Sequence, residues 1–171
     1  MSAFHWRYRP ITSERGDYSR ITGPISSSGP IVDVEIRLHP FEVERCRLEG
    51  RIVPLPFRTR AIIDTAAART CVRAATVAGL LEPVAQANVS TPSGPVKSAV
   101  YHLMLQLGSQ LDRPSDPIAI LAHTVPEVLG GEVLIGLDVL RQGKLVLYGP
   151  ENRYELILPR TAEPTPRTPN S

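Results

Sequence analysis

The feature that most constrains the fold of this chain is a series of short apolar segments separated by turn-forming residues. The segment IVDVEIRL, at 31–38, alternates apolar and polar residues with a period of two, which is typical of a half-buried strand. Further strands are predicted at 59–64, 117–122, 132–136, 144–149 and 153–158, and as a pair around a turn at 91–95 within 87–107. Short helices are predicted at 71–81 and 137–143, and turns at Glu49-Gly50 and 149–152. This pattern predicts an all-β barrel or sandwich.

The composition fits one globular domain with less ordered ends. The chain has 171 residues, of which 42% are hydrophobic and 21% charged, enough for one hydrophobic core. Residues 1–29 are polar and rich in Ser, Arg, Gly and Pro, so we expect a loosely ordered N-terminal arm. The Pro- and Thr-rich stretch 159–171 predicts a disordered tail. The folded domain is therefore expected to span residues 30–158.

Charge and residue content disfavour several classes of function. The net charge of +2 and the scattered arginines give little support to nucleic-acid binding. No apolar run approaches the roughly 20 residues of a membrane span, and the start of the chain lacks a secretory signal, so we expect no membrane partner and a cytoplasmic location. Cys46 and Cys71 have no CxxC spacing, and the four histidines are dispersed along the chain. We therefore expect free thiols, no metal site and no Cys-His catalysis.

One carboxylate stands directly after an apolar, β-branched run, in the segment IIDTAAA that contains Asp64. Burying an unpaired charge costs much free energy, so a carboxylate at the end of a buried strand points to a function. Later in the chain follow the predicted hairpin with Ser-Gly at its tip and the segment VLIGLDVL. In this order the segments resemble the retropepsin-like aspartic proteases, the single-lobe retroviral type, over about residues 30–158. The resemblance implies a closed acid-protease-like barrel with one or two short helices.

The resemblance further implies an aspartic endopeptidase that works as a homodimer. Hydrolysis needs a base that takes a proton from water and an acid that protonates the carbonyl oxygen, and two carboxylates sharing one proton supply both. The chain has one Asp-Thr-Ala stretch and is too short for two lobes. The second carboxylate is therefore expected from a second copy, with the two Asp64 side chains facing each other on a two-fold axis. The implied partner is a peptide or protein substrate, and no metal or organic cofactor is implied.

The resemblance also assigns roles to residues around this aspartate. The implied site residues are Asp64 for catalysis, Thr65 and Ala66 for support of the aspartate pair, Ala67, Ala68, Ser93 and Gly94 for substrate binding, and Gly136 as the structural glycine behind the active loop. The threonine hydroxyl would reach across the axis to the other subunit. The hairpin tip would be a flap that closes over the peptide. The glycine would let two backbone segments pass closely.

Simpler interpretations stay open beside these roles. Thr65 is also an ordinary β-branched residue, and 92–95 is also an ordinary turn. Ala66 stands where the family has glycine, so its methyl group is either accommodated at a negative φ or narrows the site and weakens catalysis. Arg69 either favours an acidic substrate segment or points into water. The alternative functions are a catalytically silent retropepsin-like domain that dimerises or binds peptide, and an unrelated small β-barrel with an accidental Asp-Thr.

Overall fold

The computed structural model describes residues 18–78, 82–91, 94–108 and 114–160, which contain ten strands and three short helices. The strands are β1 (Tyr18–Ser26), β2 (Gly29–Leu38), β3 (Phe57–Ile63), β4 (Cys71–Arg73), β5 (Ala85–Thr91), β6 (Gly94–Leu107), β7 (Ile118–Val125), β8 (Val133–Ile135), β9 (Lys144–Tyr148) and β10 (Arg153–Pro159). The helices are α1 (Pro40–Leu48), α2 (Ala74–Val77) and α3 (Leu137–Leu140). The described chain is therefore mostly β-sheet with short helices, in agreement with the expected all-β class.

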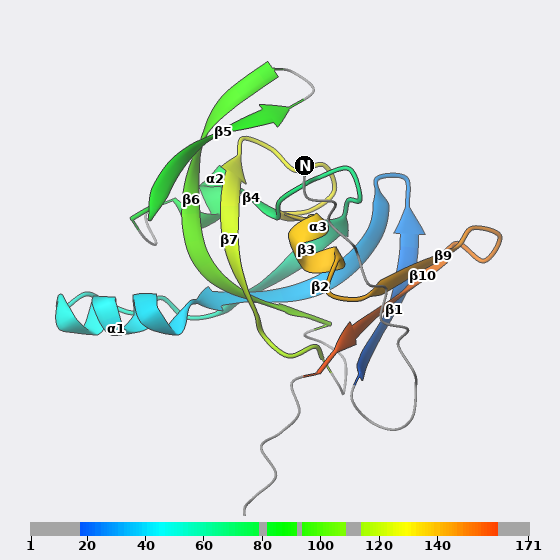
Figure 1. The fold of residues 1–171 in the computed structure, drawn as a ribbon, viewed down its shortest axis with the longest axis horizontal. Coiled ribbons are helices and arrows are strands. Elements are labelled where there is room, and N and C mark those ends of the chain that lie inside the picture. Colours follow the sequence, from blue (N-terminus) through cyan, green and yellow to red (C-terminus); the bar gives the residue numbers. More distant parts are fainter. Residues whose placement is uncertain (1–17, 79–81, 92–93, 109–113, 161–171) are drawn as a thin grey trace, which may run out of the picture.

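The strands are joined in the order β5-β6-β7-β4-β8-β3-β2-β1-β10-β9. Because β2 pairs with both β3 and β6, the pairings also form a closed circuit from β6 through β7, β4, β8, β3 and β2. β3 and β8 run parallel, with Ile63 beside Ile135, although they are far apart in the sequence. In Figure 1 the hairpin of β5 and β6 extends beyond the other strands, and α1 lies on the side away from β9 and β10.

The alternating pattern of β2 shows how the sequence forms the core. The buried residues of this strand occupy every second position, and they are Val32, Val34, Ile36 and Leu38. They pack in one apolar cluster with buried residues of the other strands, among them Leu105 and Leu156. Burying one such side chain contributes about 1.5–3 kcal/mol. The predicted strands at 31–38, 59–64, 117–122, 132–136, 144–149 and 153–158 correspond to β2, β3, β7, β8, β9 and β10.

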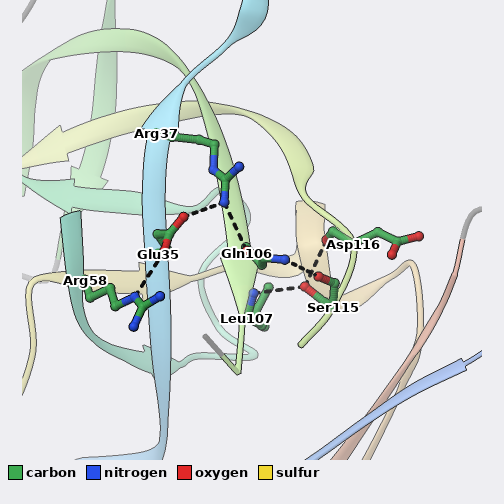
Figure 2. Close-up of polar contacts among 7 residues, drawn as sticks. All are labelled: Glu35, Arg37, Arg58, Gln106, Leu107, Ser115 and Asp116. Atoms are coloured by element: carbon green, nitrogen blue, oxygen red, sulfur yellow. Dashed lines mark hydrogen bonds and ion pairs between the residues drawn. The ribbon is translucent and has the colours of Figure 1, made fainter. Parts of the chain in front are cut away.

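The other face of β2 carries a polar network that links three strands to the segment before β7 (Figure 2). The Glu35 carboxylate accepts a hydrogen bond from Arg37 and another, of 3.1 Å, from Nε of Arg58 on β3. Arg37 also donates to Oε1 of Gln106 on β6 at 3.1 Å, and Nε2 of Gln106 donates to the carbonyl oxygen of Ser115 at 2.9 Å. The bond from Arg58 is the main cause that lowers the pKa of Glu35. This face is therefore held by charge-assisted contacts.

Helix α1 was not predicted from the sequence, because its exposed and buried residues show no apolar periodicity. Its start has a clear local cause, since Nδ1 of His39 accepts a hydrogen bond of 3.2 Å from the Phe41 amide and Pro40 occupies the first turn. Glu42 is buried in the first turn, and its carboxylate lies 2.8 Å from the Arg45 guanidinium. The His39 ring also stacks on His102 of β6, with ring centroids 3.7 Å apart. Two of the histidines described as dispersed are therefore neighbours in space.

Two further segments differ from the sequence-based expectation. Residues 18–26, placed in a loosely ordered arm, form β1, which pairs with β10 and buries Ile21. β10 supplies backbone hydrogen bonds to β1, and this distant partner cannot be recognised from the polar composition of residues 18–26. The predicted helix at 71–81 begins instead with β4, because Cys71 and Val72 are buried between β7 and β8. Of its described residues, only Ala74–Val77 are helical. Residues 1–17, 79–81 and 161–171 lie outside the described residues.

The turns predicted at Glu49-Gly50 and at 149–152 are confirmed. Gly50 ends the turn after α1 with φ +66°, a conformation that favours glycine. The Asn152 amide donates to the Gly149 carbonyl oxygen at 3.0 Å in the turn between β9 and β10. Cys46 and Cys71 are both buried and free. Within the described residues, the structure has no helix that is long and apolar enough to cross a membrane.

Candidate active-site loop

The loop that carries Asp64 leaves the end of a buried strand. The last three residues of β3 are buried, and the strand runs beside β8. The Asp64 amide donates a hydrogen bond of 3.0 Å to the Ile135 carbonyl oxygen, which fixes the start of the loop against the end of β8. The Asp64 side chain is half-buried, and its Oδ1 accepts a bond of 2.8 Å from the Ala66 amide. Asp64 thus closes an Asx-type turn that orients its own carboxylate.

Gly136 lies tightly against the back of this loop. A Cβ atom at this position would stand 2.5 Å from the carbonyl carbon of Arg69 and 2.9 Å from the carbonyl oxygen of Ala67. Both atoms belong to the backbone, so no side-chain movement could relieve such contacts. The next residue, Leu137, donates its amide to the Ala67 carbonyl oxygen at 2.8 Å. The close approach that the sequence predicted for Gly136 is therefore present in the structure.

The end of the loop is held by Thr70 and Asp138, a pair that the sequence analysis did not single out. Thr70 is fully buried, and its hydroxyl donates to Oδ1 of Asp138 at 2.8 Å. The Thr70 amide also donates to the two carboxylate oxygens, at 2.9 and 3.1 Å. In turn, the Thr70 hydroxyl accepts a bond of 3.2 Å from the Gly136 amide. The signal in the sequence was the acidic residue in the first turn of a short helix, which is available to accept bonds from a neighbouring backbone.

The middle of the loop is exposed. Ala67 is half-buried, whereas Thr65, Ala66, Ala68 and Arg69 are exposed. Among the described residues, Asn152 is the non-glycine residue with a positive φ, so the Ala66 backbone does not adopt the left-handed conformation that favours glycine. The backbone at position 66 therefore accepts alanine without strain from φ.

The hairpin that the resemblance assigns as a flap is formed by β5 and β6. The two strands pair from Ala85 beside Val100 to Thr91 beside Gly94, and Gly94 has φ +111°. Its tip includes Ser93, which lies outside the described residues. Figure 1 shows the hairpin extending away from the other strands.

Cys71 and His123 lie beside each other directly behind the loop, on β4 and β7. Burial raises the pKa of the Cys71 thiol to about 11, and the negative charges of Asp138 and Asp64 act in the same direction. Burial lowers the pKa of His123, and the Arg69 guanidinium lowers it further. A thiol with a raised pKa is neutral near pH 7 and is a poor nucleophile. The pair therefore does not support Cys-His catalysis, although its residues are adjacent.

The chemistry available in this loop centres on one carboxylate. The Asp64 side chain is within reach of solvent on an exposed loop, whereas the Asp138 carboxylate accepts bonds from Thr70 and is committed to holding the loop. Within the described ranges, no group of three or more His, Cys, Asp or Glu residues could hold a metal ion. One chain therefore presents a single carboxylate for general acid–base chemistry here.

Comparison with known proteins gives only distant structural likeness. No family model matches the chain, and no curated protein matches it. Among solved structures, the chain is similar to the solution structure of the simian foamy virus (mac) protease, with 17% sequence identity and a TM-score of 0.38. The match covers 63% of this chain and 88% of the viral protein. Because this likeness is distant, the function of the chain has to be inferred from its own residues.

Proposed function

We propose that this protein is an aspartic endopeptidase in which two chains form a homodimer and their Asp64 carboxylates activate a water molecule between them. The observation that carries the proposal is the placement of Asp64, half-buried at the start of an exposed loop whose two ends are fixed to a second segment. A carboxylate held in this way is preorganised for proton transfer, because the loop cannot easily move away from a bound peptide.

The need for a second copy follows from the acids near the loop. Water activation by paired carboxylates requires two groups that can share a proton. In the same chain, the Asp138 carboxylate accepts three hydrogen bonds from the Thr70 amide and hydroxyl and so is not free for that purpose. A two-fold axis beside the loop would place a second Asp64 opposite the first. The exposed Thr65 would then contact the other chain.

The remaining roles in this proposal concern the substrate. The small side chains of Ala67 and Ala68 leave space for an extended peptide beside the carboxylate, and the hairpin with Ser93 and Gly94 at its tip would close over that peptide and exclude water. The closed circuit of strand pairing would make the body of each subunit a small barrel. The Ala66 backbone would suit this role, since its φ is not positive.

The decisive experiment compares wild type with Asp64→Asn in a cleavage assay against a peptide library. The asparagine has nearly the same shape, and its Oδ1 can still accept the bond from the Ala66 amide, so the loop is expected to keep its conformation. Wild type should cleave peptides, and the variant should lose cleavage by at least about a hundredfold while keeping the same molecular mass in light scattering. A wild type that binds peptides but never cleaves them would favour the silent binding domain.

A mixing experiment tests whether two carboxylates act together. Wild type and Asp64→Asn are refolded together in equal amounts, so that chains pair at random. If only dimers with two Asp64 residues are active, the rate should be about one quarter of that of the same total amount of wild type. A rate near one half would show that each chain acts alone, which would refute the shared site.

A further inference from the structure

Arg69 is the large charged side chain on the exposed part of the active-site loop. Its neighbours at exposed positions are small, namely Thr65, Ala66 and Ala68. The Arg69 backbone is fixed, because Gly136 packs directly against its carbonyl group and the adjacent Thr70 is bonded to Asp138. A long side chain thus stands on a rigid base five residues after Asp64, on the same loop. Only its rotamers have to be ordered when a ligand binds.

The charges around Arg69 leave its guanidinium without an acidic partner. Within the described residues, none of the ion pairs includes Arg69. Of the acids on the loop and its support, Asp64 accepts a bond from the Ala66 amide and Asp138 accepts bonds from Thr70. Many other arginines of the chain do have carboxylate partners, such as Arg45 with Glu42 and Arg20 with Glu155. Arg69 is therefore an available cation on the loop.

The Arg69 charge also acts on one residue of the body of the domain. Arg69 is one of the charges that disfavour protonation of His123, which lies on β7 behind the loop. Because the exposed residues beside it are small, a ligand carboxylate can reach the Arg69 guanidinium, which offers several hydrogen-bond donors in one plane.

We propose that Arg69 selects peptides that carry an acidic side chain close to the bond bound at Asp64. This inference rests on the proposed function for the presence of a peptide at the loop, but it concerns which peptides bind and not whether they are cleaved. An Asp or Glu side chain of the peptide pairs with the guanidinium, and a neutral or basic side chain leaves it unpaired. The preference requires the peptide carboxylate to be ionised, and it weakens as salt screens the pair.

The test uses fluorescein-labelled octapeptides in two matched sets, in which Glu or Gln is placed at each position in turn. Binding to Asp64→Asn is measured by fluorescence anisotropy, and cleavage by wild type is measured with the same peptides. We expect at least one position at which Glu is favoured over Gln by about two- to fivefold in Kd and in kcat/KM. This factor should fall towards one in 1 M salt, where the screening length is about 3 Å.

Three variants make the result specific. In the Asp64→Asn background, Arg69→Ala should abolish the preference for Glu, Arg69→Lys should retain most of it, and Arg69→Glu should favour peptides with Lys at that position. The matched control is Arg47→Glu, which makes the same change of charge at an exposed position on α1. This control should leave the preference unchanged, because a distant exposed charge is screened.

The outcomes separate the two proposals. Binding that favours Glu and depends on Arg69, without cleavage by wild type, would support this inference and refute the peptidase. Cleavage without a preference for Glu, or with a preference that survives Arg69→Ala, would refute this inference and leave the peptidase intact. If no peptide of either set binds or is cleaved, both proposals are wrong.

Discussion

Replacing Asp138 should show how much of the fold depends on the contact behind the loop that carries Asp64. The carboxylate accepts bonds from the amide and hydroxyl of Thr70, which is fully buried. Asp138→Ala would leave both donors without a partner, and each unsatisfied buried donor costs about 1–3 kcal/mol. We therefore expect a loss of about 3–5 kcal/mol in the free energy of unfolding. That is a large part of the 5–15 kcal/mol typical of a small protein.

Two milder variants refine this expectation. Asp138→Asn keeps one acceptor oxygen and should cost about 1–2 kcal/mol, because the amide group cannot accept on its nitrogen. Thr70→Val keeps the shape but removes the hydroxyl, which leaves the Gly136 amide unpaired, and should cost about 2–3 kcal/mol. In a double-mutant cycle the two changes should couple by about 1 kcal/mol or more, since they disrupt one contact.

The measurement is urea unfolding followed by circular dichroism, with Glu44→Ala as the control. Glu44 is an exposed residue of α1, and its carboxylate lies 3.6 Å from Arg47. An exposed pair of this kind contributes at most about 1 kcal/mol, so the control should change stability little. The reasoning would be refuted if Asp138→Ala cost no more than the control, or if the double mutant were simply additive.

Three further predictions concern single positions. Gly136→Ala should lower the free energy of unfolding in urea by about 2–3 kcal/mol, because its Cβ would meet the Arg69 backbone. Gly149→Ala, with open space around it, should be nearly neutral, and equal effects of the two changes would contradict the packing. Burial and the neighbouring His102 lower the pKa of His39, so the folded state favours the neutral ring. This preference stabilises the fold above pH about 6.5, and the stabilisation is lost as the pH falls. His39→Asn, which keeps a capping acceptor, should reduce the loss of stability between pH 7.5 and 5 measured by thermal unfolding, and an unchanged loss would refute the role of His39. With its pKa raised to about 11, Cys71 should resist iodoacetamide at pH 8 in the native protein and react after unfolding, as mass spectrometry can show; rapid native labelling would contradict its burial.

The sequence was most informative where local pattern and tertiary environment agree. The alternation in 31–38 predicted β2, and the apolar end of β3 predicted that Asp64 follows a buried strand. The helix α3 followed from the residues 137–143, and the close packing of Gly136 followed from the family resemblance of VLIGLDVL. In each case the residues that define the element also supply its buried contacts, so the same short segment indicates both the secondary structure and the burial.

The sequence failed where the stabilising partner lies far along the chain. β1 is polar in composition, and its order comes from β10 at the other end of the domain. Helix α1 lacks an apolar stripe, and it is held through the cap at His39 and the stacking of that ring on His102. The Thr70–Asp138 contact joins residues 68 positions apart. Such pairings are set by the complete fold and leave little trace in any single segment.

The loop that carries Asp64 and the residues that support it lie far apart in the sequence, which affects how the protein folds during synthesis. The loop at 64–70 is synthesised early, but the contacts that hold it come from later residues, namely His123, Ile135, Leu137 and Asp138, with Gly136 packed behind it. On a ribosome, β3 can pair with β2 early, but the loop with the Asp64 carboxylate would remain unsupported until nearly the whole domain had emerged. Acquisition of the native site is therefore a late, slow event with high contact order, and a nascent or truncated chain is expected to be inert towards its neighbours.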